Sequence, residues 1–194
     1  MTYGILLAAG TSSRMGQSKQ LLEWRGRPLV RHVAEQALAS RLMIGLVVVV
    51  GAAADAVQAA LAGLDGLVIV QNPTYASGQA SSLRTGLGAL PATARAALVL
   101  LVDQPFVTPA LIDTIIVAHA TDPDARAIIP YYRGRRGNPV LLTRAIFAEL
   151  RLLEGDVGAR EVLARHAGEV RQIAVDDPAV VSDMDTPEDY AGMM

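Results

Sequence analysis

Short, nearly continuous apolar runs alternate along the chain with stretches whose apolar residues recur every three or four positions. The continuous runs are typical of strands covered on both faces, and the spaced residues are typical of amphipathic helices. Strands are expected at 5–7, 44–50, 67–70, 97–102, 127–129 and 170–175. Helices are expected at 28–40, 53–62, from 78 to about 90, at 108–119, at 161–166 and from 187. This alternation predicts a three-layer, Rossmann-like α/β fold with a mostly parallel central sheet.

Composition limits the classes of protein that this chain can belong to. Its 194 residues show no linker, repeat or low-complexity segment, so we expect a single domain over 1–194. A net charge of −2 argues against general nucleic-acid binding, and the absence of cysteine excludes thiolate metal sites. The N-terminus has no basic signal-peptide region, and the continuous apolar stretch 42–54 is too short to span a membrane. A cytoplasmic protein without nucleic-acid or membrane partners is expected.

Residues 6–22 (LLAAGTSSRMGQSKQLL) carry the most specific pattern in the chain. Glycines and hydroxyl residues follow the first apolar run, so the backbone there can turn sharply and bring its N–H groups close to a ligand. Arg14 and Lys19 add two cations, which suits a polyphosphate. The spacing fits neither a Walker loop, because Gln17 follows Gly16, nor a dinucleotide fingerprint, because position 12 is serine.

From Leu7 to Leu21 the string resembles the signature of the nucleotidyltransferases related to molybdopterin guanylyl- and cytidylyltransferases, L-A-[AG]-G-x-S-x-R-M-G-x-x-K-x-L. The resemblance implies a nucleotidyltransferase fold in which this loop wraps the triphosphate of a nucleotide. Arg14 and Lys19 would stabilise charge during the transfer. The implied nucleotide-binding residues here are Leu7, Ala8, Ala9, Gly10, Thr11, Ser12, Gly16 and Lys19. The alternative is an ordinary surface loop with solvated cations.

Two acidic positions are candidate ligands for Mg²⁺. Asp103 follows the apolar run 97–102, and the carboxyl end of a central strand is where open α/β sheets bind ligands. The resemblance to the family pattern G-D-x-P implies a catalytic, metal-binding role for Asp103, with Val102 in place of the glycine. The string 183–187 matches D-[IM]-D-T-P, which implies Asp185 as a second ligand, favoured over Asp183. The alternatives are turn capping by Asp103 and helix capping by Thr186.

Three further segments are assigned by the same resemblance. A G-x-x-x-S-[LV]-x-x-G-L element implies that Gly78 and Ser82 contact the nucleotide base, although a serine there can simply cap a helix. The second substrate is assigned to Gly137, Asn138 and Pro139, and to Arg160 within the G-D-x-G-A-R element at 155–160. Aromatic rings and cations that could bind this substrate are concentrated just before it, at Tyr131, Tyr132, Arg133, Arg135 and Arg136. A solvated hairpin with routine surface arginines explains that crowd equally well.

Together these elements imply Mg²⁺-dependent transfer of a cytidylyl group from CTP to the terminal phosphate of molybdopterin, with release of pyrophosphate. Ala9, where guanylyltransferases usually have glycine, favours CTP. The alternatives are GTP, a sugar phosphate or methylerythritol phosphate as acceptor, a cofactor carrier that serves a molybdenum hydroxylase apoenzyme, and a nucleotide-sensing module. His32, His119 and His166 are expected to be structural or exposed, since none has a ligand-like partner nearby in the sequence.

Overall fold

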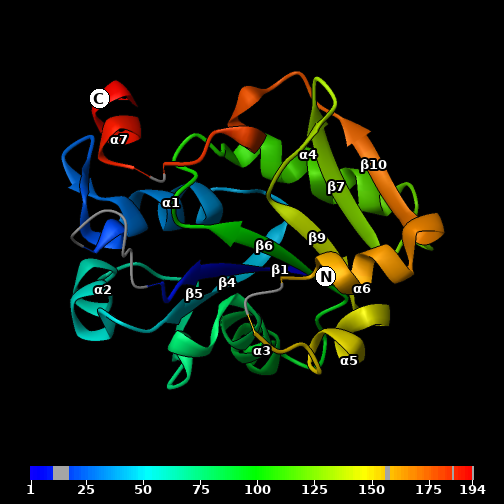
Figure 1. Cartoon of the computed structure of the whole chain (residues 1–194), viewed down its shortest axis with the longest axis horizontal. Coiled ribbons are helices and arrows are strands. Elements are labelled where there is room, and N and C mark those ends of the chain that lie inside the picture. Colours follow the sequence, from blue (N-terminus) through cyan, green and yellow to red (C-terminus); the bar gives the residue numbers. More distant parts are fainter. Residues whose placement is uncertain (11–17, 156–157, 185, 194) are drawn as a thin grey trace.

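An eight-stranded mixed sheet forms the centre of the computed structural model, which describes residues 1–10, 18–155, 158–184 and 186–193 (Figure 1). Seven strands follow the order β10-β7-β9-β6-β1-β4-β5, and β8 pairs with β7. The strands are β1 (Thr2–Ala8), β4 (Met43–Val50), β5 (Leu67–Gln71), β6 (Ala96–Leu101), β7 (Ala127–Tyr132), β8 (Arg135–Arg136), β9 (Val140–Thr143) and β10 (Val170–Ala174). A separate two-stranded hairpin consists of β2 (Glu23–Trp24) and β3 (Arg27–Pro28).

Strand β1 lies in the middle of the sheet and pairs in parallel with β4 on one side and β6 on the other. The chain first adds β4 and β5 on one side of β1 and later returns to add β6 on the opposite side. The connections from β1 to β4 and from β6 to β7 therefore join strands on opposite sides of the β1–β6 boundary. Such a reversal of strand order opens a crevice at the carboxyl edge of a sheet, where α/β proteins bind ligands.

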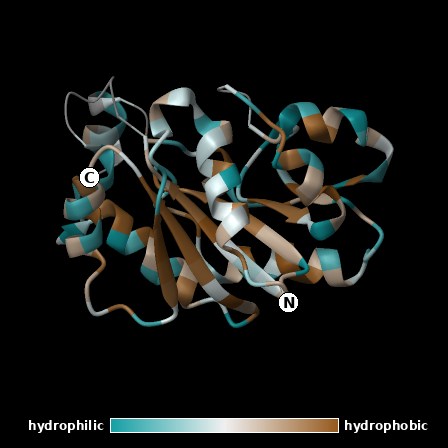
Figure 2. Ribbon diagram, turned by 90° about the horizontal axis from the view of Figure 1, so that it is seen from below, coloured by the Kyte–Doolittle hydropathy of each residue, from teal (hydrophilic) through white to brown (hydrophobic). Residues whose placement is uncertain are grey.

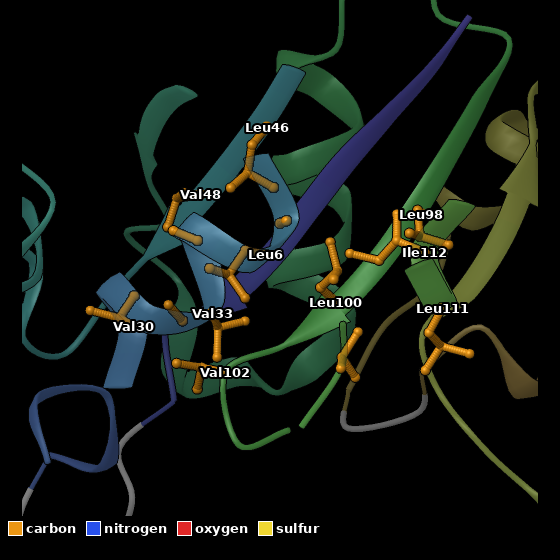
Figure 3. Close-up of a cluster of buried hydrophobic side chains, with 14 of the residues drawn as sticks. Leu6, Val30, Val33, Leu46, Val48, Leu98, Leu100, Val102, Leu111 and Ile112 are labelled. Atoms are coloured by element: carbon orange, nitrogen blue, oxygen red, sulfur yellow. The ribbon is translucent and has the colours of Figure 1, made fainter. Parts of the chain in front are cut away.

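Helices cover both faces of the sheet. They are α1 (Leu29–Leu38), α2 (Ala54–Ala60), α3 (Gln79–Ala89), α4 (Pro109–Ala120), α5 (Phe147–Leu150), α6 (Arg160–Arg165) and α7 (Pro187–Met193). Leu6 and Ala8 belong to the core that includes α1, α2 and α4, whereas Ile5 and Ala9 belong to the core that includes α3, α5 and α6. Figure 3 shows the first of these cores, with Leu6 among its members. The alternation follows from the two-residue period of a strand, and it confirms the predicted three-layer fold (Figure 2).

Most predicted elements are present, with shifted ends. The helix expected at 28–40 begins at Leu29, because Pro28 belongs to the small hairpin with β2. The hairpin of β2 and β3, strand β9 and helix α5 were not predicted; each of these strands and helices has two to four residues, too few for a clear period. Strand β8 belongs to the hairpin that was the alternative expected for the arginine-rich segment. Strand β9 also runs antiparallel to β6 and β7, so the sheet is mixed at one side. Among the described residues, none of the helices has the length and apolar character required to cross a membrane.

Candidate functional site

Lys19 and Asp103 form an ion pair at the carboxyl edge of the sheet. Lys19 begins a short 3-10 helix (Lys19–Leu21), and Asp103 follows the end of β6. The Nζ atom of Lys19 lies 3.2 Å from Oδ2 of Asp103, and the two side chains are 10 % and 24 % exposed. A partly desolvated cation and carboxylate at a strand end provide one group for phosphate oxygens and one for a divalent cation.

Gln20 joins the end of β1 to the segment that carries Lys19. Its Nε2 atom donates to the carbonyl oxygens of Ala8 at 3.1 Å and Gly10 at 2.7 Å. The residue is only 1 % exposed, so these bonds form away from solvent and fix the position of Lys19 relative to the strand. Sequence reasoning did not select Gln20. The available signal was a polar residue between Lys19 and Leu21 in a run that otherwise buries its side chains.

A cavity of about 650 Å³, which we call the lysine cavity, opens beside this ion pair. It is lined by Leu7, Ala9, Gly10, Lys19, Gln20, Tyr75, Ala76, Ser77, Gly78, Gln79, Ser82, Leu101, Val102 and Asp103. Most of the described residues predicted to bind nucleotide therefore share one cavity. Ala8 differs, because its side chain packs in the core with α1 and only its carbonyl oxygen joins the Gln20 contact. The predicted residues Thr11, Ser12, Arg14 and Gly16 lie outside the described residues.

The start of α3 forms another wall of the lysine cavity. Gly78 precedes the helix with a φ of 106°, a conformation that side chains disfavour, so glycine suits this position. Behind it, Asn72 Nδ2 donates to Ser81 Oγ at 2.8 Å and to Ser82 Oγ at 3.1 Å. The cap residue of α3 is Gly78 rather than a serine, so helix capping does not account for Ser82.

The segment after Val181 is attached directly to Asp103 and its neighbour. The N–H of Met184 donates to the carbonyl oxygen of Asp103 at 2.9 Å, and Gln104 Nε2 donates to Asp183 Oδ1 at 2.6 Å. The predicted second ligand, Asp185, lies outside the described residues. Thr186 does cap α7: its Oγ1 accepts from Asp189 N at 3.2 Å, and its N–H donates to Asp189 Oδ2 at 2.8 Å.

A second cavity of about 440 Å³, the arginine cavity, lies next to the first. It is lined by Leu7, Gln79, Leu83, Val99, Leu101, Arg136, Gly137, Asn138, Val140, Leu142, Gly158, Ala159 and Arg160. Partial burial of the Arg136 guanidinium, and then the charge of Arg160, lower the pKa of Arg136 below its ordinary value. Two like charges facing an apolar floor suit an anion attached to a partly apolar body.

The residues predicted to hold the second substrate divide between the cavity and the core. Gly137, Asn138 and Arg160 line the arginine cavity, whereas the neighbouring Pro139 is buried and is not part of its wall. A Cβ atom on Gly137 would lie 2.5 Å from the carbonyl oxygen of Val180, so close packing requires glycine there. Of the predicted arginine-rich crowd, only Arg136 reaches the wall, and β7 and β8 form the hairpin that presents it.

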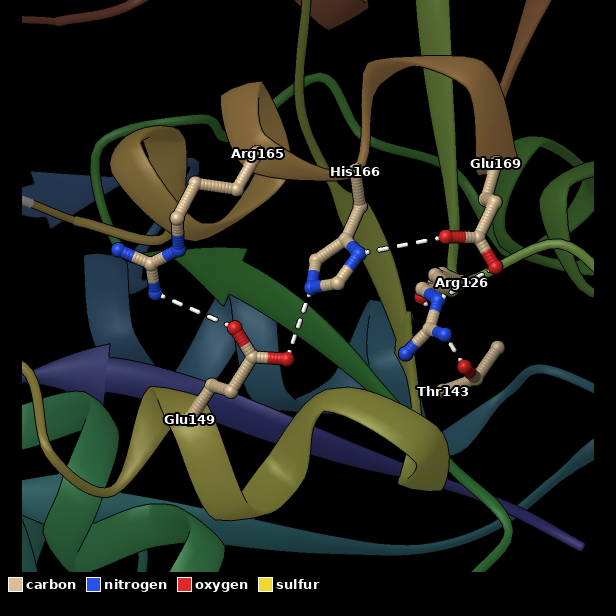
Figure 4. A network of polar contacts seen from close by, with 6 residues as sticks. All are labelled: Arg126, Thr143, Glu149, Arg165, His166 and Glu169. Atoms are coloured by element: carbon tan, nitrogen blue, oxygen red, sulfur yellow. Dashed lines mark hydrogen bonds and ion pairs between the residues drawn. The ribbon is translucent and has the colours of Figure 1, made fainter.

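A polar network holds the far end of α6, the helix that begins at Arg160 (Figure 4). His166 caps this helix, and its Nε2 atom lies 2.7 Å from Glu149 Oε1, while its Nδ1 atom lies 3.3 Å from Glu169 Oε1. Hydrogen bonds from His166 first, and from Arg165, lower the pKa of Glu149. The network joins α6 to α5 and is separate from the residues that line either cavity.

The two cavities share part of their walls, which consists of Leu7, Gln79 and Leu101. Leu7 and Leu101 are paired neighbours near the carboxyl ends of β1 and β6. One side of this boundary holds the Lys19–Asp103 pair and the other holds Arg136 and Arg160. The arrangement provides two adjacent sites for anionic groups, which is what the transfer of a phosphorus-containing group between two substrates requires.

Comparisons with known proteins agree with this geometry. A family model described as MobA-like NTP transferase domain matches residues 4–170. Nicotine blue oxidoreductase of Paenarthrobacter nicotinovorans is 35% identical over 95% of this chain and 92% of its own, and molybdenum cofactor cytidylyltransferase of Escherichia coli K12 is 27% identical over 96% and 92%.

Solved structures extend the agreement to three dimensions. Rv0371c from Mycobacterium tuberculosis H37Rv superimposes with a TM-score of 0.85 at 34% identity, covering 99% of this chain and 96% of that one. A manganese complex of the same protein superimposes with a TM-score of 0.78 at 33% identity, covering 99% and 97%. The match over most of the chain, together with the fold and its paired cavities, shows that this protein belongs to the MobA-like NTP transferase family.

Proposed function

We propose that this protein transfers a cytidylyl group from CTP to the terminal phosphate of molybdopterin. The observation that carries the proposal is the pair of adjacent cavities, one with Lys19 and Asp103 and one with Arg136 and Arg160. An oxygen of the acceptor phosphate attacks the α-phosphorus of CTP, the bond from that phosphorus to the β-phosphate oxygen breaks, and pyrophosphate leaves. Positioning and charge neutralisation supply most of the catalysis in such a step.

In this proposal the lysine cavity holds CTP. Lys19 and the predicted Arg14 hold the triphosphate, and Gly78 and Ser82 lie on the wall assigned to the base. Leu7, Ala9 and Gly10 bring the backbone at the end of β1 to the phosphates, and Gln20 fixes that end. Because Lys19 is held by both Asp103 and its buried surroundings, it meets an incoming phosphate with little reorganisation.

The chemistry of the residues at Asp103 fits a divalent cation. Asp103 would hold Mg²⁺ through its carboxylate, with Asp185 as the predicted second ligand. Mg²⁺ usually combines one or two carboxylates with substrate phosphates, and when bound it neutralises phosphate charge. Support comes from a solved relative described as a complex with manganese.

The arginine cavity suits the acceptor. Its apolar floor of leucine and valine side chains fits a ring system, and Arg136 and Arg160 fit a phosphate. The predicted residues Gly137 and Asn138 lie on the same wall, beside β9. A molybdenum hydroxylase apoenzyme is the proposed recipient of the product.

Pyrophosphate release tests the proposal directly. Purified protein is incubated with Mg²⁺, each of the four NTPs in turn, and molybdopterin, GTP being the nearest alternative donor; the product is identified by its mass. We expect release only with the acceptor present, highest with CTP, and a product heavier by one CMP unit minus water. Sugar phosphates and methylerythritol phosphate serve as alternative acceptors. Tight molybdopterin binding without any pyrophosphate release would instead support a carrier.

The same experiment should include an assay for oxidoreductase activity, because one relative is named nicotine blue oxidoreductase. Reduction of nicotine blue by a nicotinamide dinucleotide is measured under the same conditions. The loop after β1 lacks the dinucleotide fingerprint, since position 12 is serine, so we expect no such reduction. Reduction of the dye without nucleotidyl transfer would overturn the proposed function.

A further inference from the structure

Gln79 is the polar member of the three residues that line both cavities. Leu7 and Leu101 contribute apolar surface to the shared boundary, so the side-chain amide of Gln79 is the group there that can exchange hydrogen bonds with both occupants. A primary amide donates and accepts, and it carries no charge that would repel phosphate. Sequence reasoning gave Gln79 no role.

The backbone holds Gln79 at this boundary from two directions. It is the first residue of α3, immediately after Gly78, so the helix start sets its position. The next residue, Ala80, donates its N–H to the carbonyl oxygen of Gly155 at 3.2 Å. The element that contains Arg160 is therefore attached to the same turn that lines the lysine cavity.

The side chain of Gln79 also touches that element. A Cβ atom placed on Gly158 would lie 3.0 Å from Gln79 Oε1, so the amide lies close to Gly158 and would have to shift by a few tenths of an ångström to admit a side chain there. Gly158, Ala159 and Arg160 are consecutive in the wall of the arginine cavity. A shift of this wall would therefore be felt by the amide of Gln79.

We propose that Gln79 is a positioning residue that couples the two cavities, so that occupation of the arginine cavity tightens nucleotide binding in the lysine cavity. The proposal rests on the proposed function for the identity of the two ligands. Physically, an occupant of the arginine cavity orders the Gly158–Arg160 wall, the wall restricts the Gln79 amide, and the amide presents a fixed hydrogen-bonding group to the nucleotide. Nucleotide binding then costs less ordering of the protein.

Calorimetry measures the coupling without turnover. The α,β-methylene analogue of whichever NTP the protein binds is titrated with Mg²⁺, first alone and then with saturating molybdopterin. We expect the acceptor to tighten analogue binding by about fivefold or more in the wild type, a typical size for coupled sites. In Gln79→Ala the ratio should fall below about twofold. A wild-type ratio of one, or an unchanged ratio in Gln79→Ala, would overturn the proposal.

Ser77→Ala is the matched control. Ser77 lines the lysine cavity but not the arginine cavity, and its hydroxyl donates to Thr74 O within its own turn. Its substitution should leave the coupling ratio near that of the wild type even where absolute affinity changes. Loss of the ratio in Ser77→Ala as well would attribute the effect to general damage at the turn and would contradict a specific role for Gln79.

A double-mutant cycle with Gly158 examines the contact itself. Gly158→Ala places a methyl group against Gln79 Oε1, so it should lower the coupling ratio in the wild-type background and change little in the Gln79→Ala background. Equal effects in both backgrounds would contradict the contact as the route of coupling. Thermal unfolding of each variant verifies that the fold is retained.

A second probe separates this proposal from the proposed function. Inorganic phosphate replaces molybdopterin and reports on the arginines without assuming the acceptor. Coupling with phosphate in a protein that releases no pyrophosphate supports the role of Gln79 while it contradicts the transferase. Turnover in a protein without coupling supports the transferase and contradicts the proposed role of Gln79.

Discussion

Lys19 Nζ lies 3.2 Å from Asp103 Oδ2, although the two residues are 84 positions apart in the chain. The sheet explains this proximity: β1 and β6 run parallel with Leu7 opposite Leu101, so the segments that follow them leave from adjacent strand ends. Gln20 then ties the Lys19 segment back to the end of β1. The cation and the carboxylate are therefore positioned by strand pairing and by the hydrogen bonds of Gln20.

Replacing Lys19 with alanine should lower kcat for pyrophosphate release by about 10²–10³-fold, because the transition state loses a pre-positioned cation. Steady-state kinetics with CTP and molybdopterin provide the measurement. Lys19→Arg retains the charge, so its kcat should be higher than that of the alanine variant. Turnover in Lys19→Ala equal to that of the wild type would remove Lys19 from the catalytic machinery.

Replacing Arg136 with alanine should raise the KM for the acceptor by about 10–100-fold, the size of one lost hydrogen bond to a charged group, with a smaller effect on the KM for CTP. Arg135→Ala is a matched control, because Arg135 lies on the same two-residue strand without lining the cavity. The two variants are compared in acceptor titrations. Equal rises in KM for both would show that general positive charge, rather than the cavity, binds the acceptor.

The layers of the fold were predictable because they depend on periodicity. The buried run of β4, for example, has apolar residues on both faces, and this indicates a strand between two helical layers. Two strand-end motifs also indicated Lys19 and Asp103 as separate candidate site residues, but their ion pair was not predicted. In contrast, β9 has four residues and pairs antiparallel with both neighbours, and no local sequence pattern predicts the direction of so short a strand.

The parts of the site that sequence reasoning missed depend on tertiary contacts. Gln20 acts through carbonyl oxygens of Ala8 and Gly10, and such backbone partners leave no trace in side-chain patterns. The sequence did not show which of Arg133, Arg135 and Arg136 faces the cavity. The β7–β8 hairpin places Arg136, and neither of the other two, in the cavity wall. Gln79 likewise gains importance only once the two cavities are seen to share a boundary.

Gly86 and Gly88, two positions apart in α3, should respond in opposite ways to alanine. A Cβ on Gly86 would lie 2.5 Å from Ile5 Cγ2 and 3.2 Å from Val49 Cγ2, both in stiff, buried side chains, so Gly86→Ala should destabilise by about 1–3 kcal/mol. A Cβ on Gly88 meets nothing within 4 Å, so Gly88→Ala should stabilise by about 0.5–1 kcal/mol. Urea unfolding measures both; a stabilised Gly86→Ala would contradict the close approach of α3 to β1.

His32 should make the stability of the protein depend on pH below neutrality. It is buried beside Trp24, and its Nε2 atom lies 2.9 Å from the carbonyl oxygen of Pro105, two residues after Asp103. Burial is the largest cause that lowers the pKa of His32 from its ordinary value of 6.5, while the hydrogen bond to Pro105 opposes it. The folded protein therefore holds the imidazole neutral, with its proton on Nε2 if it donates to that carbonyl.

Because the pKa of His32 is lower in the folded than in the unfolded state, its contribution to stability is present above pH 6.5 and is lost as the pH falls from 6.5 through the folded-state pKa. Thermal unfolding at about pH 8 and at about pH 5.5 should therefore show a loss of stability in the wild type. His32→Gln keeps an N–H donor toward Pro105 but does not titrate, so its loss should be smaller. His119→Gln is the control for the other histidine with a lowered pKa, on α4. If His32→Gln and the wild type lose the same stability while His119→Gln loses less, the acid sensitivity originates on α4 and not in the contact behind Asp103.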